Sequence, residues 1–235
     1  METADSLSAR MLGVIRAPRA TFGRLAANPR YVDVLLVTFL VTAFSSALLL
    51  ETETGRLALL DQWERTALAF GQPVTDSSYA MLARASENGV AYAAASALAN
   101  GPLLTVALSA ALFGAFRLAR GGGATYRQVL AVVAHAGVIL MLRQLVATPI
   151  VYARETLASP TTFSLFFTML DETSPLARFF GIVDLFVMWW VIVLAIGMST
   201  LYRQPARRLA LAFMGTYVTL AAILTIAMAL TGGTA

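Results

Sequence analysis

Long apolar stretches alternate with short polar segments along this chain. An α-helix needs about 20 predominantly apolar residues to cross the hydrocarbon core of a bilayer. The chain therefore predicts an all-α fold, a polytopic membrane helix bundle with five transmembrane helices. These helices are expected in the five stretches that carry almost no charge, near 32–50, 90–118, 126–152, 176–202 and 209–230.

The composition agrees with a membrane protein. The chain is 58% hydrophobic and 13% charged, whereas soluble domains carry about 25% charged residues. It has no cysteine and one histidine, which excludes disulfide frameworks, thiolate metal sites and His-rich metal centres. The 17 basic residues are all arginine and are scattered, so we expect no nucleic-acid partner. We also expect no metal and no cofactor.

The chain is predicted to have two parts, a cytoplasmic amphipathic segment over 1–31 and a single membrane domain over 32–235. In 6–27, apolar residues recur at helical spacing with arginines between them, a pattern typical of a helix lying among anionic lipid headgroups. Pro18 should divide this helix. The alternative is a helix that packs under the bundle and is anchored by protein. The residues expected to contact the lipid surface are Arg10, Arg16, Arg19 and Arg24.

Two connections between predicted spans have helical character. In the connection 51–89, apolar residues recur every three or four positions, and Gly71-Gln72-Pro73 separates two helical segments. The connection 153–175 contains a shorter apolar run after Ser159-Pro160. We expect both connections to form short amphipathic helices that cover the extracytoplasmic ends of the bundle.

Arginine counts predict the orientation of the chain. Eleven arginines fall in the N-terminal segment and in the connections after the second and fourth spans, and five fall in the other two connections. Cytoplasmic loops carry an excess of basic residues. We therefore expect a cytoplasmic N-terminus and an extracytoplasmic C-terminus.

Polar groups inside the predicted spans form the candidate site, because an unpaired charge there costs roughly 2.5–3.5 kcal/mol. The helix rise places Arg143 and Asp184 about 12–14 Å below the outer boundary, and Asn100 at about 15 Å. We predict an Arg143–Asp184 ion pair with Asn100 nearby, in a buried polar layer of helices two to four. Asn100-Gly101-Pro102 should break the second helix at this level. Asp33 lies near the inner end of the first span, where water can hydrate it.

Two interpretations of this layer stay open. The ion pair either fixes helix register only, or lines a cavity for a proton, an ion or a lipid headgroup. His135, nearer the inner half, is either a hydrogen-bonded structural residue or a pH-responsive group. Ser199 lies too close to its helix end to pair directly with His135 as a nucleophile and base. We assign no catalytic residue and expect no enzyme.

Three segments resemble a bacterial member of the Yip1 domain family. Residues 15–25, Ile-Arg-Ala-Pro-Arg-Ala-Thr-Phe-Gly-Arg-Leu, are similar to the family's Pro-x-x-Thr-Phe-x-x-Leu entry motif. Thr125-Tyr126-Arg127-Gln128 leads into the third span, and Asp184 to Trp190 lies in the fourth. The resemblance implies five membrane helices, a cytoplasmic N-terminus and a bacterial cytoplasmic (inner) membrane. Eukaryotic relatives act in vesicle traffic with Rab-type GTPases, but their Asp-Leu-Tyr-Gly-Pro motif is missing here, which argues against GTPase binding.

Two functional hypotheses follow. The first is a non-enzymatic integral membrane protein of the Yip1-like type that scaffolds partners or organises membrane lipid. Its partners would be the lipid bilayer and its anionic headgroups, with a membrane-protein partner or a homo-oligomer as further expectations. The alternative is a small transporter or proton-linked channel that uses the polar layer of Asn100, Arg143, Asp184 and His135.

Overall fold

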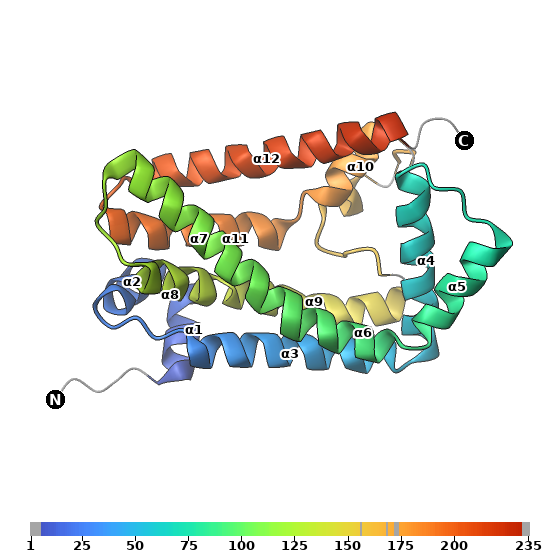
Figure 1. Cartoon of the computed structure of the whole chain (residues 1–235), viewed down its shortest axis with the longest axis horizontal. Helices are drawn as coiled ribbons and strands as arrows, with labels where there is room; N and C mark the ends of the chain where they lie inside the picture. Colours follow the sequence, from blue (N-terminus) through green and yellow to red (C-terminus); the bar gives the residue numbers. More distant parts are fainter. Residues whose placement is uncertain (1–5, 156, 168, 172–173, 232–235) are drawn as a thin grey trace. The chain divides into compact units, whose positions relative to one another are not determined.

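The computed structural model is helical almost throughout (Figure 1). It describes residues 6–155, 157–167, 169–171 and 174–231. No strand forms within these ranges, where an isolated β-bridge links Thr162 to Asp184. Among the described residues, five helical segments are long and apolar enough to cross a membrane, which confirms the predicted all-α, five-span fold. They are Val32–Leu50, Gly89–Ala119, Tyr126–Arg154, Leu185–Tyr202 and Ala206–Thr231.

The N-terminal segment forms two helices, α1 (Leu7–Arg16) and α2 (Pro18–Ala27). The Ser6 side chain accepts a hydrogen bond from the Ala9 N–H and so caps α1. Pro18 is the first residue of α2, where its missing N–H and fixed φ cost nothing. The predicted division at Pro18 is therefore present.

The first two spans follow the predicted pattern. The first is the single helix α3 (Val32–Leu50), and the second comprises α6 (Gly89–Ala95), the π-helix η1 (Ser96–Asn100) and α7 (Gly101–Arg120). The break expected at Asn100-Gly101-Pro102 takes the form of this π-helical turn, since Pro102 cannot donate an α-helical hydrogen bond. A Cβ at Gly101 would lie 2.4 Å from the Phe39 ring, so glycine is what allows α7 to approach α3 there.

The third and fourth spans are each interrupted. In the third, α8 (Tyr126–Ala136) and α9 (Val138–Arg154) meet at Gly137. The fourth predicted stretch, 176–202, divides into α10 (Pro175–Ile182) and α11 (Leu185–Tyr202), so the prediction of one continuous helix there is wrong. Val183 adopts an extended conformation, and its backbone bonds to another segment of the chain. The fifth span is α12 (Ala206–Thr231).

Short helices also form in the two long connections. The first connection contains α4 (Glu53–Ala69) and α5 (Asp76–Ser86), and Thr75 forms a capping box at the start of α5. The second contains the 3-10 turn η2 (Phe163–Phe166). The helical character of both connections matches the sequence pattern, and their extracytoplasmic location remains a prediction.

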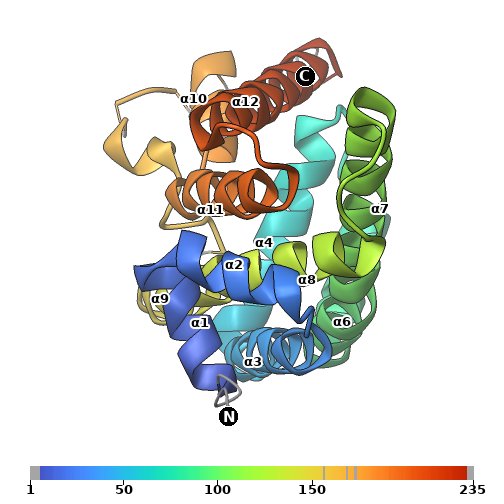
Figure 2. The same cartoon turned by 90° about the vertical axis from the view of Figure 1, so that its left-hand side faces the viewer.

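The chain divides into two compact units. The first unit comprises Met1–Val41, Ala97–Leu142 and Phe186–Gly215, and the second comprises Thr42–Ser96, Arg143–Leu185 and Thr216–Ala235. In the first unit, α1 and α2 pack against α8, as Figure 2 shows from the side of the N-terminal helices. Its core joins side chains of α1, α2, α8 and α11, including Val14, Phe22, Val132, Val193 and Met198.

Gly197 allows close packing in this core. A Cβ at Gly197 of α11 would lie 2.4 Å from Val132 and 3.2 Å from the Phe22 ring. The N-terminal helix pair is therefore held by interlocked side chains and not only by its connection to α3.

The second unit has its own smaller core. Leu50 at the end of α3, Leu59 of α4 and Ala93 of α6 are buried together, with Trp63 packed against them. The Trp63 and Tyr92 rings meet edge to face with centroids 5.3 Å apart. This core fixes α4 against the ends of the first and second spans.

Candidate functional site

The structure brings Arg143 and Asp184 together within the second unit. Arg143 lies on α9, and Asp184 lies at the break between α10 and α11. The Arg143 Nε donates to Asp184 Oδ2 at 2.8 Å. The Asp184 side chain is buried and the Arg143 side chain is partly exposed. A buried carboxylate needs such a partner, because burying an unpaired charge is strongly unfavourable.

Two hydroxyl groups complete the surroundings of this pair. Thr161 Oγ1 donates to Asp184 Oδ2 at 2.5 Å, and Ser159 Oγ donates to the same oxygen at 3.2 Å. Arg143 also donates from Nη2 to Ser159 Oγ at 2.9 Å. The four side chains form one network that ties the segment around Pro160 to α9. Sequence reasoning missed Ser159 and Thr161, although two hydroxyl residues flanking a proline close to the third span were a visible signal.

The backbone at the helix break is satisfied by the same segment and by α12. The Phe163 N–H donates to the Val183 carbonyl at 2.9 Å, and the Leu185 N–H donates to the Thr161 carbonyl at 3.0 Å. The Asp184 N–H donates to the Tyr217 hydroxyl at 3.0 Å, and this hydroxyl donates to the Ile182 carbonyl at 2.8 Å. Backbone groups freed within a membrane protein need partners of this kind. The break is therefore a stabilised feature that positions Asp184.

This break changes the depth assigned to Asp184. The sequence estimate counted helical rise from Leu176 along a continuous helix, and no such helix exists. Asp184 instead directly precedes the apolar span that begins at Leu185. Chemically, the network is an ion pair whose carboxylate already accepts three hydrogen bonds from protein groups. This arrangement agrees with the structural interpretation, in which the pair holds elements in register.

A second charged cluster lies in the first unit and was not predicted. Arg10 of α1 pairs through Nη2 with Asp33 Oδ2 at the start of α3. Its Nη1 lies 3.4 Å from Nε2 of the buried His135 of α8. His135 Nδ1 lies 2.8 Å from the Ala131 carbonyl oxygen, which can only accept, so Nδ1 carries the proton and Nε2 accepts from Arg10. The cluster therefore joins α1, α3 and α8.

The Arg10–Asp33–His135 cluster corrects two expectations. Arg10 was expected to contact lipid, but it is buried and paired within the protein. Asp33 was expected to be simply hydrated, but it is the ion-pair partner of Arg10. Arg10 lies one helical turn before the core residue Val14, but the sequence pattern alone does not identify which arginine of α1 faces the protein. His135 is buried as expected, with Arg10 and Ala131 as its partners.

Asn100 and the other three arginines expected to contact lipid, Arg16, Arg19 and Arg24, are exposed. Asn100 ends η1 and is exposed, so the prediction that it is buried is wrong. Its hydrogen bonding to the Arg143–Asp184 pair stays a prediction. Arg16 at the end of α1, and Arg19 and Arg24 on α2, are exposed, as the expected lipid contact requires. The N-terminal helices thus combine a buried apolar face with an exposed basic face.

The five apolar spans and the buried, internally paired charges define an integral, multi-pass membrane protein. The chain belongs to the Yip1 domain family, whose model matches residues 12–228. The match begins within α1 and ends within α12, so it includes all of the first four spans and most of the fifth, and it confirms the resemblance seen in the sequence. Comparisons with curated proteins and with solved structures find no match.

Proposed function

We propose that this protein is a non-enzymatic integral membrane protein that organises anionic membrane lipid around its N-terminal helix pair. The observation that carries the proposal is the docking of α1 and α2 into the core of the first unit. Val14, Phe22 and Leu25 are buried there, while Arg16, Arg19 and Arg24 are exposed. A basic surface held in a fixed position can gather headgroups without the cost of ordering a flexible tail.

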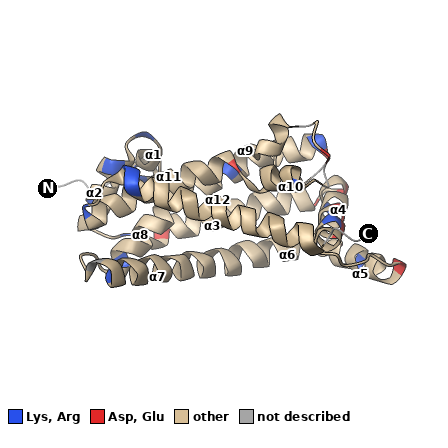
Figure 3. Ribbon diagram, turned by 90° about the horizontal axis from the view of Figure 1, so that it is seen from above, with Lys and Arg blue, Asp and Glu red and all other residues tan. Residues whose placement is uncertain are grey.

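The charge of the helix pair supports this role. Residues 6–31 carry five arginines and no acidic residue, and blue segments mark the arginines along α1 and α2 in Figure 3. Asp33 pairs with Arg10. Each basic residue close to an anionic bilayer surface contributes about 1 kcal/mol of attraction. The connection 51–89 has the opposite balance, with six acidic residues and three arginines. We therefore expect anionic lipid to gather at the helix pair and not at α4 and α5.

The proposed setting is a bacterial cytoplasmic membrane with the helix pair on the cytoplasmic side. The excess of arginine in the N-terminal segment and in the connections after the second and fourth spans supports this orientation. Because the chain has no cysteine, a single Ser8→Cys variant provides a clean probe. In spheroplasts, a membrane-impermeant maleimide should leave this cysteine unlabelled until the membrane is opened. Labelling of intact spheroplasts would show that the N-terminus lies outside the cytoplasm and would contradict the proposed orientation.

The lipid role is tested with the full chain in vesicles of phosphatidylcholine and phosphatidylglycerol. Electron paramagnetic resonance of spin-labelled lipids measures how strongly each lipid associates with the protein. Replacing Arg16, Arg19 and Arg24 together by glutamine should lower the preference for phosphatidylglycerol, and added salt should weaken the preference of the unmodified chain. The matched control replaces Arg56, Arg84 and Arg154, which lie in the second unit, and should change the preference less. An unchanged preference in the first variant would refute the lipid role.

The geometry of the Arg143–Asp184 network does not favour a transporter or proton-linked channel. Such a function needs Arg143 and Asp184 to present hydrogen-bonding capacity to a ligand, whereas Ser159 and Thr161 occupy the carboxylate oxygen that faces Arg143. A scaffold for a membrane-protein partner or a second copy of the chain remains compatible with the exposed basic face.

A further inference from the structure

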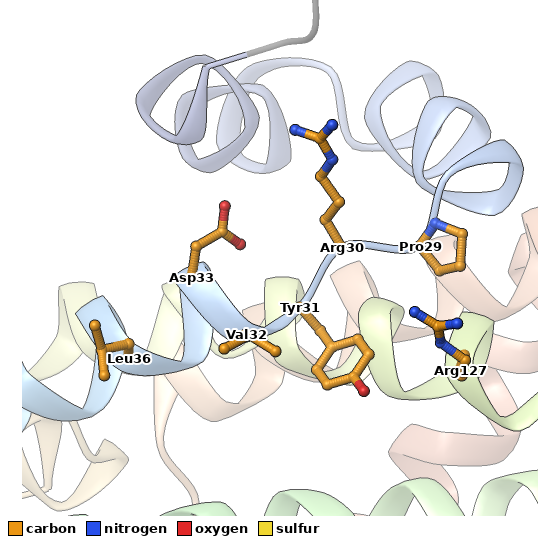
Figure 4. Close-up of a pocket in the computed structure, with 7 residues that line it drawn as sticks. All are labelled: Pro29, Arg30, Tyr31, Val32, Asp33, Leu36 and Arg127. Carbon is orange, nitrogen blue, oxygen red and sulfur yellow. The ribbon is translucent and has the colours of Figure 1, made fainter.

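A pocket of about 520 Å³ opens where α3 begins (Figure 4). Its walls come from the segment Pro29–Asp33, from Leu36 one turn further along α3, and from Arg127 in the first turn of α8. All of these residues belong to the first unit. None of the lining residues belongs to the Arg143–Asp184 network, and Arg16, Arg19 and Arg24 do not line the pocket.

The pocket carries an excess of positive charge. Arg30 and Arg127 are exposed, and neither has a hydrogen-bond or ion-pair partner among the residues that the structure describes. Figure 4 shows Arg127 beside Pro29 and Tyr31, while Arg30 extends from the same backbone segment toward α1 and α2. The acidic group in the wall, Asp33, already accepts from Arg10 at Oδ2 and from the Val34 N–H at Oδ1. An added anion beside Tyr31 would therefore meet the Arg127 guanidinium, with Arg30 adding positive charge from the side of α1 and α2 and with the Asp33 carboxylate already neutralised.

An apolar surface continues directly from the charged end of the pocket. Val32 and Leu36 are exposed, and Leu40 extends the same face of α3 at four-residue spacing. Tyr31 lies at the point where the apolar span begins, the position that aromatic residues favour at a bilayer interface. The third span also begins at this pocket, with Tyr126. The positive charge of the pocket matches the anionic headgroup of a phospholipid, and the adjoining apolar face of α3 matches its acyl chains. Both features lie where the first and third spans begin.

We propose that this pocket binds one anionic glycerophospholipid. Its phosphodiester accepts hydrogen bonds from Arg127, because a guanidinium group matches the geometry of phosphate oxygens. Arg30 adds positive charge at the side of the pocket that faces α1 and α2. One acyl chain lies along Val32, Leu36 and Leu40. The inference deepens the proposed function and rests on it for the nature of the ligand, since it adds a single defined lipid to the general attraction of the helix pair.

The test uses the full chain in a mild detergent, titrated with phosphatidylglycerol and observed by native mass spectrometry. We expect an adduct of one phosphatidylglycerol per chain at concentrations where phosphatidylcholine gives none. Arg127→Gln should weaken this adduct about fivefold, the effect of one basic residue close to an anionic headgroup. The matched control, Arg207→Gln, removes an exposed arginine of the same unit outside the pocket and should leave the adduct unchanged.

A second variant and a second ligand sharpen the result. Val32→Glu adds a carboxylate to the pocket wall and should weaken phosphatidylglycerol binding through charge repulsion, while thermal unfolding checks that the variant is folded. Glycerol 3-phosphate, which has the phosphate without the acyl chains, should not compete. Equal effects of Arg127→Gln and Arg207→Gln, or full competition by glycerol 3-phosphate, would overturn the proposal.

These experiments distinguish a failure of the pocket assignment from a failure of the proposed lipid-organising function. If the pocket variants leave the adduct intact while replacement of Arg16, Arg19 and Arg24 still lowers the vesicle preference, the pocket assignment is wrong and the proposed function stands. If the triple variant has no effect while Arg127→Gln removes the adduct, the pocket stands and the broader lipid role fails.

Discussion

The two buried ion pairs of this protein are built in opposite ways. In the Arg10–Asp33 pair the cation is buried, with 6% of its side chain exposed against 43% for the carboxylate. In the Arg143–Asp184 pair the carboxylate is buried, with 3% exposed against 32% for the arginine. A buried carboxyl group that loses its partner can take up a proton, whereas a guanidinium cannot lose its charge. The pair with the buried arginine therefore has less freedom to adjust its charge.

The neighbouring hydrogen-bond partners of each ion pair increase this difference in sensitivity. Asp184 retains hydrogen bonds from Ser159 and Thr161 if Arg143 is removed. Arg10 would retain only the neutral His135, and its Nε already has no partner among the described residues. The Arg10–Asp33–His135 cluster should therefore be the more sensitive of the two.

The largest effect is expected for Asp33→Asn. The substitution leaves the buried Arg10 charge without a counter-ion, which should lower the free energy of unfolding by about 3 kcal/mol. This is the lower end of the range for buried pairs, because the Asp33 side chain is itself 43% exposed. Unfolding of the purified chain in mixed micelles, with increasing dodecyl sulfate, measures this change. A loss below that of Arg143→Gln would contradict the comparison of the two pairs.

A smaller effect is expected for Arg143→Gln. The change removes a charge-assisted hydrogen bond, worth about 1.5–3 kcal/mol, and leaves Asp184 with its two hydroxyl donors. The same unfolding measurement applies. Adding Thr161→Val to this variant should produce a further loss, because it removes one of the remaining donors. If the double variant is as stable as the single one, the hydroxyl groups do not support the carboxylate.

Tyr217→Phe tests the helix break itself. It removes two hydrogen bonds, one to the Ile182 carbonyl and one from the Asp184 N–H, and should cost about 1–2 kcal/mol. Hydrogen exchange should become faster at the Asp184 amide, which loses its acceptor. Tyr79→Phe on α5 is the matched control, since Tyr79 is exposed. Unchanged exchange at Asp184 would show that the hydroxyl does not hold the break.

The smallest effect is expected for Asp61→Asn. Asp61 pairs with Arg65 one turn along α4, and both side chains are exposed. Exposed pairs contribute about 0–1 kcal/mol because water and salt screen them. The stability loss of this variant is the baseline for the loss in Asp33→Asn, where the partner Arg10 is buried. A loss larger than that of Tyr217→Phe would show that burial does not determine the cost of breaking these ion pairs.

The sequence predicted those parts of the fold that depend on local properties. The length and apolarity of a span can be read directly from consecutive residues. Pro18 and Pro102 mark breaks because proline cannot donate a backbone hydrogen bond. The break at Val183 and Asp184 has no such marker. Its partners, Thr161, Phe163 and Tyr217, lie elsewhere in the chain, so only the folded structure reveals it.

The candidate site also contains residues that the sequence predicted and residues that only the folded structure reveals. Arg143 and Asp184 were found because charged residues within apolar spans stand out and have opposite signs. Ser159 was missed because a hydroxyl residue in a polar connection is ordinary in sequence. Arg10 was assigned to lipid because the amphipathic pattern does not say which arginine faces the protein. Arg10 faces inward because its partners, Asp33 and His135, lie on other helices of the folded chain.

The attachment of residues 159–163 to the break between α10 and α11 bears on how the topology of this protein can be mapped. An epitope or reporter inserted there would separate hydrogen-bonded partners and report on a misfolded chain. Gly121-Gly122-Gly123 offers a better insertion point, since all three residues have positive φ and a Cβ at Gly121 or Gly122 would meet no atom within 4 Å. Tags placed at this glycine turn should leave the native threading of the polypeptide undisturbed.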